Sequence, residues 1–206
     1  MGCFELDAAY VLLPVFAYLL GSIPFGLVLT ALFSDVDIRR EGSGNIGATN
    51  VRRTAGNRIG VLTLVCDVLK GSLPVYLSIT PATMSTSPGQ LFVSTIAIAA
   101  ITGHFFPVYL KFKDGGKGVA TTAGAFLMIS PTAVVVALLV FILCLCWFNR
   151  VSVASLAAAA VLPVAVWEAT GSGIFTGTAA LIATAIFIRH KDNLRRLLSG
   201  TEPTIW

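Results

Sequence analysis

Charged residues are scarce in this sequence. Asp, Glu, Lys and Arg supply 12% of its 206 residues, whereas hydrophobic residues supply 56%. A soluble globular domain carries about 25% charged residues, so we expect most of this surface to face lipid. The net charge of +4 is concentrated in the connections between apolar stretches and needs no nucleic acid to explain it. These observations predict one all-α membrane domain over residues 1–206, without a nucleic-acid partner.

Patterns typical of metal sites and disulfide frameworks are also missing. Cys3, Cys66, Cys144 and Cys146 lack zinc or redox spacing, and free cysteines commonly pack as small apolar residues. The sequence has no His-x-Glu pair, no Gly-x-Ser-x-Gly elbow and no pair of catalytic carboxylates. These absences disfavour metal-assisted and acyl-enzyme mechanisms, and we expect no cofactor.

A cleavable signal peptide is not indicated. Glu5 and Asp7 occupy the place of a basic n-region, and no small-x-small site ends the first apolar stretch. We therefore expect the first apolar helix to be retained in the membrane.

The chain contains six apolar stretches. A bilayer needs about 20 helical residues for one crossing. They cover residues 8–33, 59–80, 90–110, 119–147, 151–168 and 173–189. The fourth stretch is too long for one ordinary crossing. Ser130-Pro131 divides it, because proline interrupts the hydrogen bonding of a helix and restricts the residue before it.

The distribution of positive charge predicts the topology. The connections near 81–89, 130–131 and 169–172 lack Lys and Arg, whereas basic residues follow the first, third, fourth and last stretches. Basic loops remain cytoplasmic in membrane proteins. All the basic connections lie in the cytoplasm if residues 119–129 and 132–148 cross the membrane separately. This arrangement gives seven spans, with the N-terminus outside and the C-terminus cytoplasmic. One long 119–147 helix would give six spans, and one interfacial late segment would give five.

A glycine-rich polar segment at 42–56 follows the first apolar stretch. Ser43, Asn45, Thr49 and Asn50 supply donors and acceptors, and Arg52 and Arg53 supply guanidinium groups that suit phosphate. Gly42, Gly44 and Gly47 let backbone N–H groups approach a ligand closely. We expect this segment to be a phosphate-binding loop, with the next helix beginning near Arg58.

A second glycine loop, Gly115-Gly116-Lys117-Gly118, precedes the short 119–129 stretch. Glycine N–H groups, a helix N-terminus and a lysine together favour a phosphate. The spacing is not that of a Walker A motif.

Other polar residues accompany these loops. Asp67 and Lys70 lie three residues apart within an apolar stretch, either as a structural ion pair or with Lys70 near the site. His104 lies where the third stretch nears the basic side. Arg150 and Ser152 open the fifth stretch. His190 and Asn193 follow the last one within a basic segment that would also suit an interfacial helix.

Three of these segments resemble, in order, the signatures of the bacterial acyl-phosphate:glycerol-3-phosphate acyltransferases. The first is 42–53, the second runs from Gly-His-Phe-Phe-Pro at 103–107 to 121, and the third comprises Arg189, His190, Asn193, Arg196, Leu197, Gly200 and Glu202. Asp67-x-x-Lys70-Gly71 and Arg150-x-Ser152 also resemble family elements. One departure is Asp114, inserted after Phe112-Lys113, which leaves open which of Lys111, Lys113 and Lys117 lies in the site; Lys117 is preferred.

The resemblance implies transfer of a fatty acyl group from acyl phosphate to the sn-1 hydroxyl of glycerol 3-phosphate. The products are lysophosphatidic acid and phosphate, in phospholipid synthesis at the cytoplasmic face of the cell membrane. The expected partners are the two substrates and membrane lipid. Contact with the enzyme that makes acyl phosphate and the oligomeric state are left open.

The resemblance also implies roles. Ser43, backbone N–H groups and Asn193 would hold acyl phosphate, and Arg53 and Lys117 would bind glycerol 3-phosphate. His190 would orient the nucleophile or the leaving group, and either His190 or the departing phosphate would take the proton. The further substrate-binding candidates are Gly42, Gly44, Asn45, Gly47, Thr49, Asn50, Lys70, His104, Gly115, Gly116, Gly118 and Ser152.

The main alternative is a small membrane transporter for a phosphorylated solute. Asp67 and Lys70 would suit a translocation path, and broken helices occur in transporters. The lack of an internal repeat and the crowding of polar residues on one side favour the acyltransferase.

Overall fold

The first apolar stretch forms two helices, α1 (Ala9–Ser22) and α2 (Phe25–Phe33), which are bent by 44° relative to each other. Pro24 precedes the first residue of α2, where its missing N–H costs no helical hydrogen bond. The structure is a computed structural model that describes residues 8–205, so Cys3, Glu5 and Asp7 lie outside the described residues.

Helices account for all the regular structure in the described part of the chain. After α2 come α3 (Ala48–Ala55), α4 (Asn57–Ser78), α5 (Pro81–Ser85), α6 (Ser87–Phe105), the 3₁₀ turn η1 (Val108–Leu110), α7 (Val119–Ile129), α8 (Pro131–Phe148), α9 (Val151–Thr170), α10 (Gly173–Arg189) and α11 (Lys191–Leu198).

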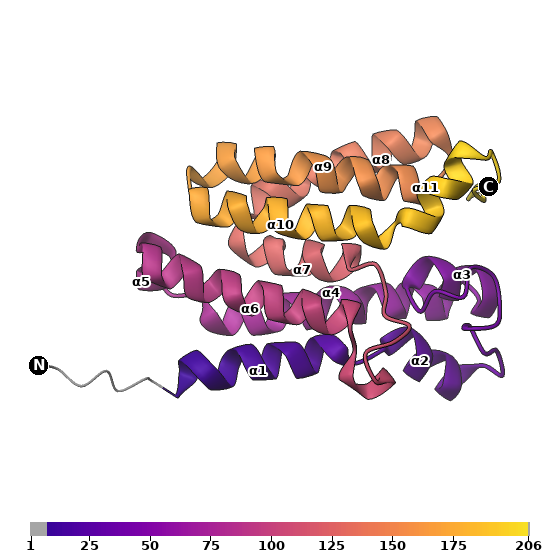
Figure 1. Ribbon diagram of the computed structural model, residues 1–206, viewed down its shortest axis with the longest axis horizontal. Coiled ribbons are helices and arrows are strands. Elements are labelled where there is room, and N and C mark those ends of the chain that lie inside the picture. Colours follow the sequence, from indigo (N-terminus) through magenta and orange to yellow (C-terminus); the bar gives the residue numbers. More distant parts are fainter. Residues whose placement is uncertain (1–7, 206) are drawn as a thin grey trace, which may run out of the picture.

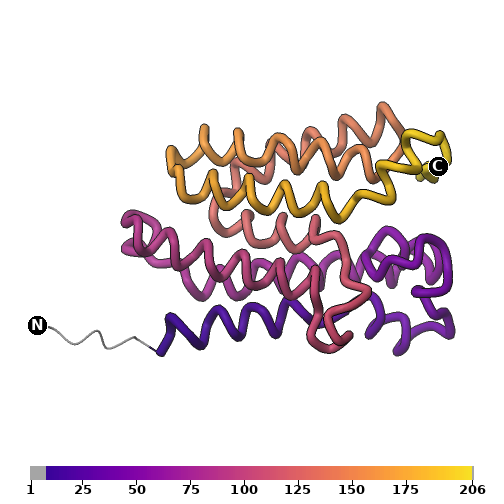
Figure 2. Tube along the Cα trace, in the orientation of Figure 1, coloured from indigo at the N-terminus to yellow at the C-terminus, as the bar shows by residue number. Residues whose placement is uncertain are grey.

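The longer helices lie side by side along the long axis of the molecule (Figure 1). The α5 helix lies at one end, whereas α3, α11, the loop after α6 and the C-terminal segment lie at the other (Figures 1 and 2). We call the second of these the polar end. Segments far apart in sequence therefore meet there.

Four helices, α4, α6 with η1, α8 and α9, are long and apolar enough to cross a membrane. The count rises to six if the bent pairs α1–α2 and α10–α11 each form one crossing. The predicted break at Ser130-Pro131 is confirmed: α7 ends at Ile129, and the Ser130 side chain accepts a hydrogen bond from the Ala133 N–H at the start of α8. With 11 residues, α7 is about 16 Å long, which is shorter than a bilayer core.

Glycines allow two helix pairs to pack at backbone contact. A Cβ at Gly21 of α1 would collide with the carbonyl of Ala100 in α6, and one at Gly103 of α6 would collide with that of Tyr18. A Cβ at Gly71 of α4 would likewise meet the Thr121 carbonyl of α7. These contacts fix α6 and α7, and therefore both ends of the loop between them.

The main core lies between α1, α6, α7, α9 and α10 and includes Ile96, Phe126 and Phe175. By contrast, α8 buries only Ala133 among its described residues and exposes a nearly continuous apolar surface. Apolar exposure on this scale fits contact with lipid tails.

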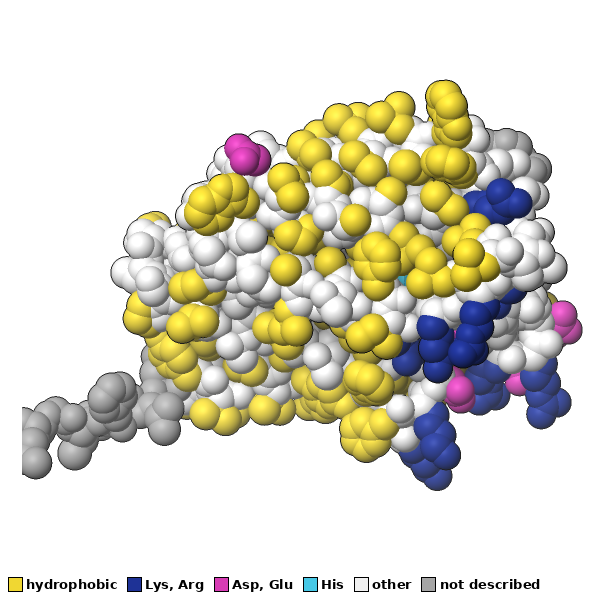
Figure 3. Space-filling model, turned by 45° about the horizontal axis from the view of Figure 1, so that its top comes forward, with side chains coloured by type: hydrophobic (Ala, Val, Ile, Leu, Met, Phe, Trp, Pro, Cys, Tyr) yellow, Lys and Arg dark blue, Asp and Glu magenta, His cyan; other side chains and the backbone are white. Residues whose placement is uncertain are grey.

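Basic side chains gather at the polar end. Figure 3 shows Lys and Arg clustered there, while the rest of the visible surface is mainly apolar or uncharged. Lys70 is the exception, because it is buried within α4. The arrangement agrees with the charge asymmetry expected from the sequence.

Candidate active site

The first polar segment is shaped by Asn50. Its Nδ2 donates to the carbonyls of Ile38 and Glu41, and its Oδ1 accepts from the Ser43 N–H at 2.8 Å. Asn50 is buried, so its amide serves the loop itself. The same segment is turned by Gly42 and Gly44 at φ of 60° and 67°, a region that few other residues adopt readily.

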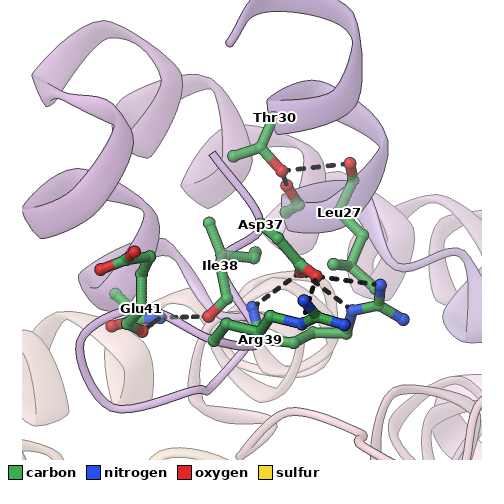
Figure 4. A network of polar contacts seen from close by, with 9 residues as sticks. Leu27, Thr30, Asp37, Ile38, Arg39 and Glu41 are labelled. Carbon is green, nitrogen blue, oxygen red and sulfur yellow. Dashed lines mark hydrogen bonds and ion pairs between the residues drawn. The ribbon is translucent and has the colours of Figure 1, made fainter. Parts of the chain in front are cut away.

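Residues that precede this polar segment also hold it in place. Figure 4 shows Arg39 beside the Asp37 carboxylate, with Ile38 and Glu41 on the same turn; the Arg39 Nε donates to Asp37 Oδ1 at 3.0 Å. Ile38, Ile46 and Val51 form a small core beneath it. The loop is therefore an ordered element of the fold.

The expectation that residues 42–56 form one loop is wrong in its second half. Residues 48–55 form α3, because Val51 is drawn into the small core and the helix packs against α4. Ser43 is exposed, and Asn45 Oδ1 accepts the Gly47 N–H at 2.9 Å just before α3. Thr49 lies half-buried in the first turn.

The two arginines of α3 point in different directions. Arg52 packs its Cβ against Gly60 of α4. Arg53 is exposed and donates from Nη2 to the carbonyls of Pro203 and Thr204, at 3.5 Å and 3.3 Å. Arg53 is thus the arginine that faces the C-terminal segment.

The second glycine loop is seated on His104 and Phe105. A Cβ at Gly116 would overlap the His104 Nε2, and one at Gly115 would overlap the Phe105 carbonyl. Gly118 has φ of 77° and lies against the Phe105 ring. His104 is buried here, and its Nδ1 lies 3.8 Å from Asp67 Oδ1.

Arg189 binds the same loop from the opposite side. Its Nε donates to the Gly116 carbonyl at 3.1 Å, and its Nη2 donates to the Gly115 carbonyl. The guanidinium also lies over the rings of Phe105 and Phe106. Sequence reasoning included Arg189 in the third signature but gave it no role, because bonds to backbone carbonyls leave no pattern of residue types.

Lys117 differs from its two neighbours in the same loop. Lys111 and Lys113 are exposed, whereas Lys117 is partly buried. Burial lowers the pKa of Lys117 to about 8, and Glu202 counteracts part of this effect. The extra residue, Asp114, is exposed at φ of 54° and interacts electrostatically with Arg39.

The third segment centres on Glu202. Its Oε1 accepts from Asn193 Nδ2 at 2.7 Å and its Oε2 from Arg196 Nε at 2.8 Å. Burial raises its pKa, but these hydrogen bonds keep the pKa below its ordinary value. Ser152 is buried and close enough to Glu202 to help lower its pKa. The Ser152 hydroxyl nevertheless makes no hydrogen bond of normal geometry within the described residues.

His190 lies between α10 and α11 and is buried. Its Nδ1 lies 2.8 Å from the Ile186 carbonyl, which can only accept, so Nδ1 carries the hydrogen and Nε2 is the acceptor in the neutral ring. Burial lowers the pKa of His190 to about 4, with nearby Lys117 adding to the effect. The imidazole is therefore neutral at pH 7.

Lys70 is held by its own partners. Its Nζ lies 2.9 Å from Asp67 Oδ1 and donates to the Ile23 carbonyl at 2.9 Å. Both charged side chains are buried. This arrangement has the form of a structural ion pair joining α4 to the break between α1 and α2.

A cluster at the polar end combines residues from all three segments. Electrostatic interactions connect Lys117 with Arg53, Arg196 and Glu202, and His190 with Lys117 and Glu202. The cluster combines three cations, Lys117, Arg53 and Arg196, with the Glu202 carboxylate, which is already held by hydrogen bonds, and Asp192 also interacts with Lys117. Such a site suits phosphate groups.

Residues 11–200 match the family model described as glycerol-3-phosphate acyltransferase. The chain belongs to this family. It is 49% identical to the glycerol-3-phosphate acyltransferase of Syntrophotalea carbinolica, over 90% of this chain and 92% of the relative. It is 45% identical to that of Geotalea daltonii, over 93% of this chain and 95% of the relative.

The family's fold is also recognisable in solved structures. The chain resembles the crystal structure of PlsY (YgiH), an integral membrane glycerol 3-phosphate acyltransferase, in its glycerol 3-phosphate form, with TM-score 0.90, 36% identity and 96% of each chain covered. The lysophosphatidic acid form of PlsY matches with TM-score 0.88 and 36% identity, over 96% of each chain. The protein described here is accordingly a multi-pass membrane protein.

Proposed function

We propose that this protein acylates the sn-1 hydroxyl of glycerol 3-phosphate with acyl phosphate as donor, in phospholipid synthesis. Membership of the glycerol-3-phosphate acyltransferase family supports the acceptor and the acyl transfer. The observation that carries the proposal is the cluster of Arg53, Lys117 and His190 at the polar end, drawn from three separate segments. Two phosphorylated substrates need such concentrated positive charge.

Lys117 and Arg53 bind the phosphate of glycerol 3-phosphate in this proposal. Both are cationic at neutral pH and lie within electrostatic reach of each other. Arg53 is already oriented by the Pro203 and Thr204 carbonyls, so little conformational entropy is lost when a phosphate replaces or joins these acceptors.

The first polar segment holds the acyl phosphate. Ser43 is exposed, and its backbone N–H is committed to Asn50, so the hydroxyl is the part that faces a ligand. Gly44 and Gly47 support the segment through N–H groups bound to the Glu41 carbonyl and to Asn45 Oδ1, and Thr49 adds the start of α3. Asn50 supports this segment from beneath, and Asn193 is held by Glu202 on the other side of the site.

The chemistry is direct attack. The sn-1 oxygen forms a bond to the acyl carbonyl carbon, the bond from that carbon to the phosphate oxygen breaks, and the departing phosphate takes the hydroxyl proton. A pKa of about 4 makes His190 a weak base, so its Nε2 orients the hydroxyl as a hydrogen-bond acceptor. Positioning and charge neutralisation supply the catalysis.

The same proposal includes seven crossings with the site facing the cytoplasm. Successive crossings run between the two ends of the bundle in alternating directions, and the short α7 is one of these crossings. The connections at the polar end carry the basic residues. Close packing of α7 against α4, through Gly71 of α4 and Gly124 of α7, compensates for the short length of α7. The N-terminus is then outside and the C-terminus cytoplasmic.

Purified protein tests the reaction. Acyl phosphate and glycerol 3-phosphate should yield lysophosphatidic acid and inorganic phosphate in equal amounts. Acyl-coenzyme A in place of acyl phosphate should yield neither more product than a protein-free control nor free coenzyme A. Transfer from coenzyme A, or uptake of glycerol 3-phosphate into vesicles without acylation, would contradict the proposal.

A further inference from the structure

Arg189 differs from the other basic residues at the polar end in what it binds. Both of its described hydrogen bonds go to backbone carbonyls of the second glycine loop, Gly115 and Gly116. Its side chain is partly buried and stacked against Phe105 and Phe106. It takes part in no ion pair within the described residues.

The two carbonyls determine how the loop faces its surroundings. In a trans peptide the N–H points opposite to the C=O of the same unit. The Gly115 carbonyl shares its unit with the Gly116 N–H, which donates to the His104 carbonyl at 3.1 Å. The Gly116 carbonyl shares its unit with the Lys117 N–H, which therefore points away from Arg189.

We infer that Arg189 is a positioning residue for phosphate binding, acting through the peptide unit of Gly116 and Lys117. In this inference the unit, with its carbonyl held by Arg189, turns the Lys117 N–H toward the cationic cluster to which the Lys117 side chain belongs. The Lys117 N–H makes no hydrogen bond among the described residues and is free to donate to a phosphate oxygen. The inference rests on the proposed function, in which Lys117 binds glycerol 3-phosphate.

Glycine makes this clamp necessary. Gly115 and Gly116 have no side chains to restrict their peptide planes, and substitution is blocked by contact with His104 and Phe105. A cation on the carbonyl side also polarises the amide, which strengthens donation from its N–H. Arg189 satisfies both requirements with one planar group that binds two acceptors at once.

Three variants test the role. Arg189→Gln removes the cation, Arg189→Lys keeps it but cannot hold two carbonyls with a planar fork, and Lys191→Gln removes an exposed charge two residues away as a control. At saturating acyl phosphate we expect the KM for glycerol 3-phosphate to rise about tenfold or more in Arg189→Gln, in line with loss of a hydrogen bond to a charged group. The rise should be smaller in Arg189→Lys, and Lys191→Gln should stay within about twofold.

The split between KM and kcat distinguishes positioning from support of the fold. A purely structural role would lower kcat and the unfolding temperature and leave KM unchanged, and this result would overturn the inference. If Arg189→Gln does not fold, the KM and kcat of Arg189→Lys alone distinguish the two roles. Combining Arg189→Lys with Lys117→Gln should raise KM beyond Lys117→Gln alone, because Lys117→Gln removes the ammonium but keeps the backbone N–H that Arg189 orients.

Lys117→Gln separates this inference from the proposed function. If Lys117→Gln leaves the KM for glycerol 3-phosphate unchanged, the proposed phosphate site is wrong and the inference fails with it. If Lys117→Gln raises KM and both Arg189 variants do not, only the role of Arg189 is refuted.

Discussion

Asn193 and Glu202, nine positions apart in the sequence, are joined by a hydrogen bond of 2.7 Å from the amide Nδ2 to the carboxylate Oε1. Glu202 also accepts from Arg196, and its backbone carbonyl accepts from the Arg150 Nε at 3.3 Å. One carboxyl residue thus ties α11 to the start of α9 beside the cationic cluster.

Glu202→Gln should destabilise the protein by about 2 kcal/mol, the scale of a lost hydrogen bond to a charged group. Asp192→Asn, which breaks an exposed pair with Arg195, should change stability by less than about 1 kcal/mol. The pKa of Glu202 lies below its ordinary 4.5, so its contribution is present above that pH and is lost as the pH falls through the lower folded value. Thermal unfolding in detergent measures the stability of both variants. Equal losses of stability in Glu202→Gln and Asp192→Asn would contradict this account.

Glycerol 3-phosphate binding should weaken above pH 8. The pKa of Lys117 is lowered to about 8, so the ammonium is present below that pH and is lost as the pH rises through it. KM for glycerol 3-phosphate should be flat near pH 7 and then rise by up to about tenfold per pH unit. Lys117→Arg keeps its charge over this range and should remove the rise. The same rise in Lys117→Arg would exclude Lys117 as its source.

Arg53→Ala should reduce kcat/KM for glycerol 3-phosphate far more than Arg52→Ala. Loss of a charge that pairs with substrate costs about 2–5 kcal/mol, or roughly 30- to 5,000-fold. Arg52 contacts Gly60 through its Cβ, which alanine keeps, so Arg52→Ala should change stability and binding little. Steady-state kinetics of both variants provide the comparison, and similar mild losses in the two would reject the assignment.

The proposed orientation predicts a labelling pattern in intact cells. In a background without Cys3, Cys66, Cys144 and Cys146, a cysteine at Ser85 of α5 should react with a membrane-impermeant thiol reagent. Cysteines at Ser43 or Ser199 should react only after permeabilisation. The reverse pattern would place the site outside.

Ser43 should bind substrate without becoming acylated. Acyl phosphate is already activated, and an acyl-enzyme would need a base to activate the hydroxyl. Radiolabelled acyl phosphate without glycerol 3-phosphate should leave no label on the denatured protein. Stable label at Ser43 that transfers to added glycerol 3-phosphate would establish a two-step mechanism instead.

Hydropathy and proline predicted the long helices closely. The 173–189 stretch coincides with α10, and Ser130-Pro131 marks the boundary between α7 and α8. These features are local, because apolar length and a missing N–H are properties of the segment itself. The bend between α1 and α2 lay within one apolar stretch and was not predicted.

Interactions between distant segments were harder to predict. The α3 helix contains Thr, Asn and two Arg next to glycine and resembles a loop until Val51 packs into the small core. Asn50 looked like a ligand residue, yet its amide binds the loop's own backbone. Residue type predicted a phosphate site at the polar end, but only the tertiary structure distinguishes side chains that shape the loops from side chains that face the cluster.

The contacts of residues 189–204 with both earlier segments also set an order of assembly. A ribosome makes the first polar segment and the second glycine loop long before Arg189, His190 and Glu202. Arg53 obtains its carbonyl partners, and Gly115 and Gly116 obtain theirs, only when this late segment docks. During synthesis the earlier membrane helices can therefore insert while the proposed site is still incomplete, and we expect activity to begin only when this late segment docks.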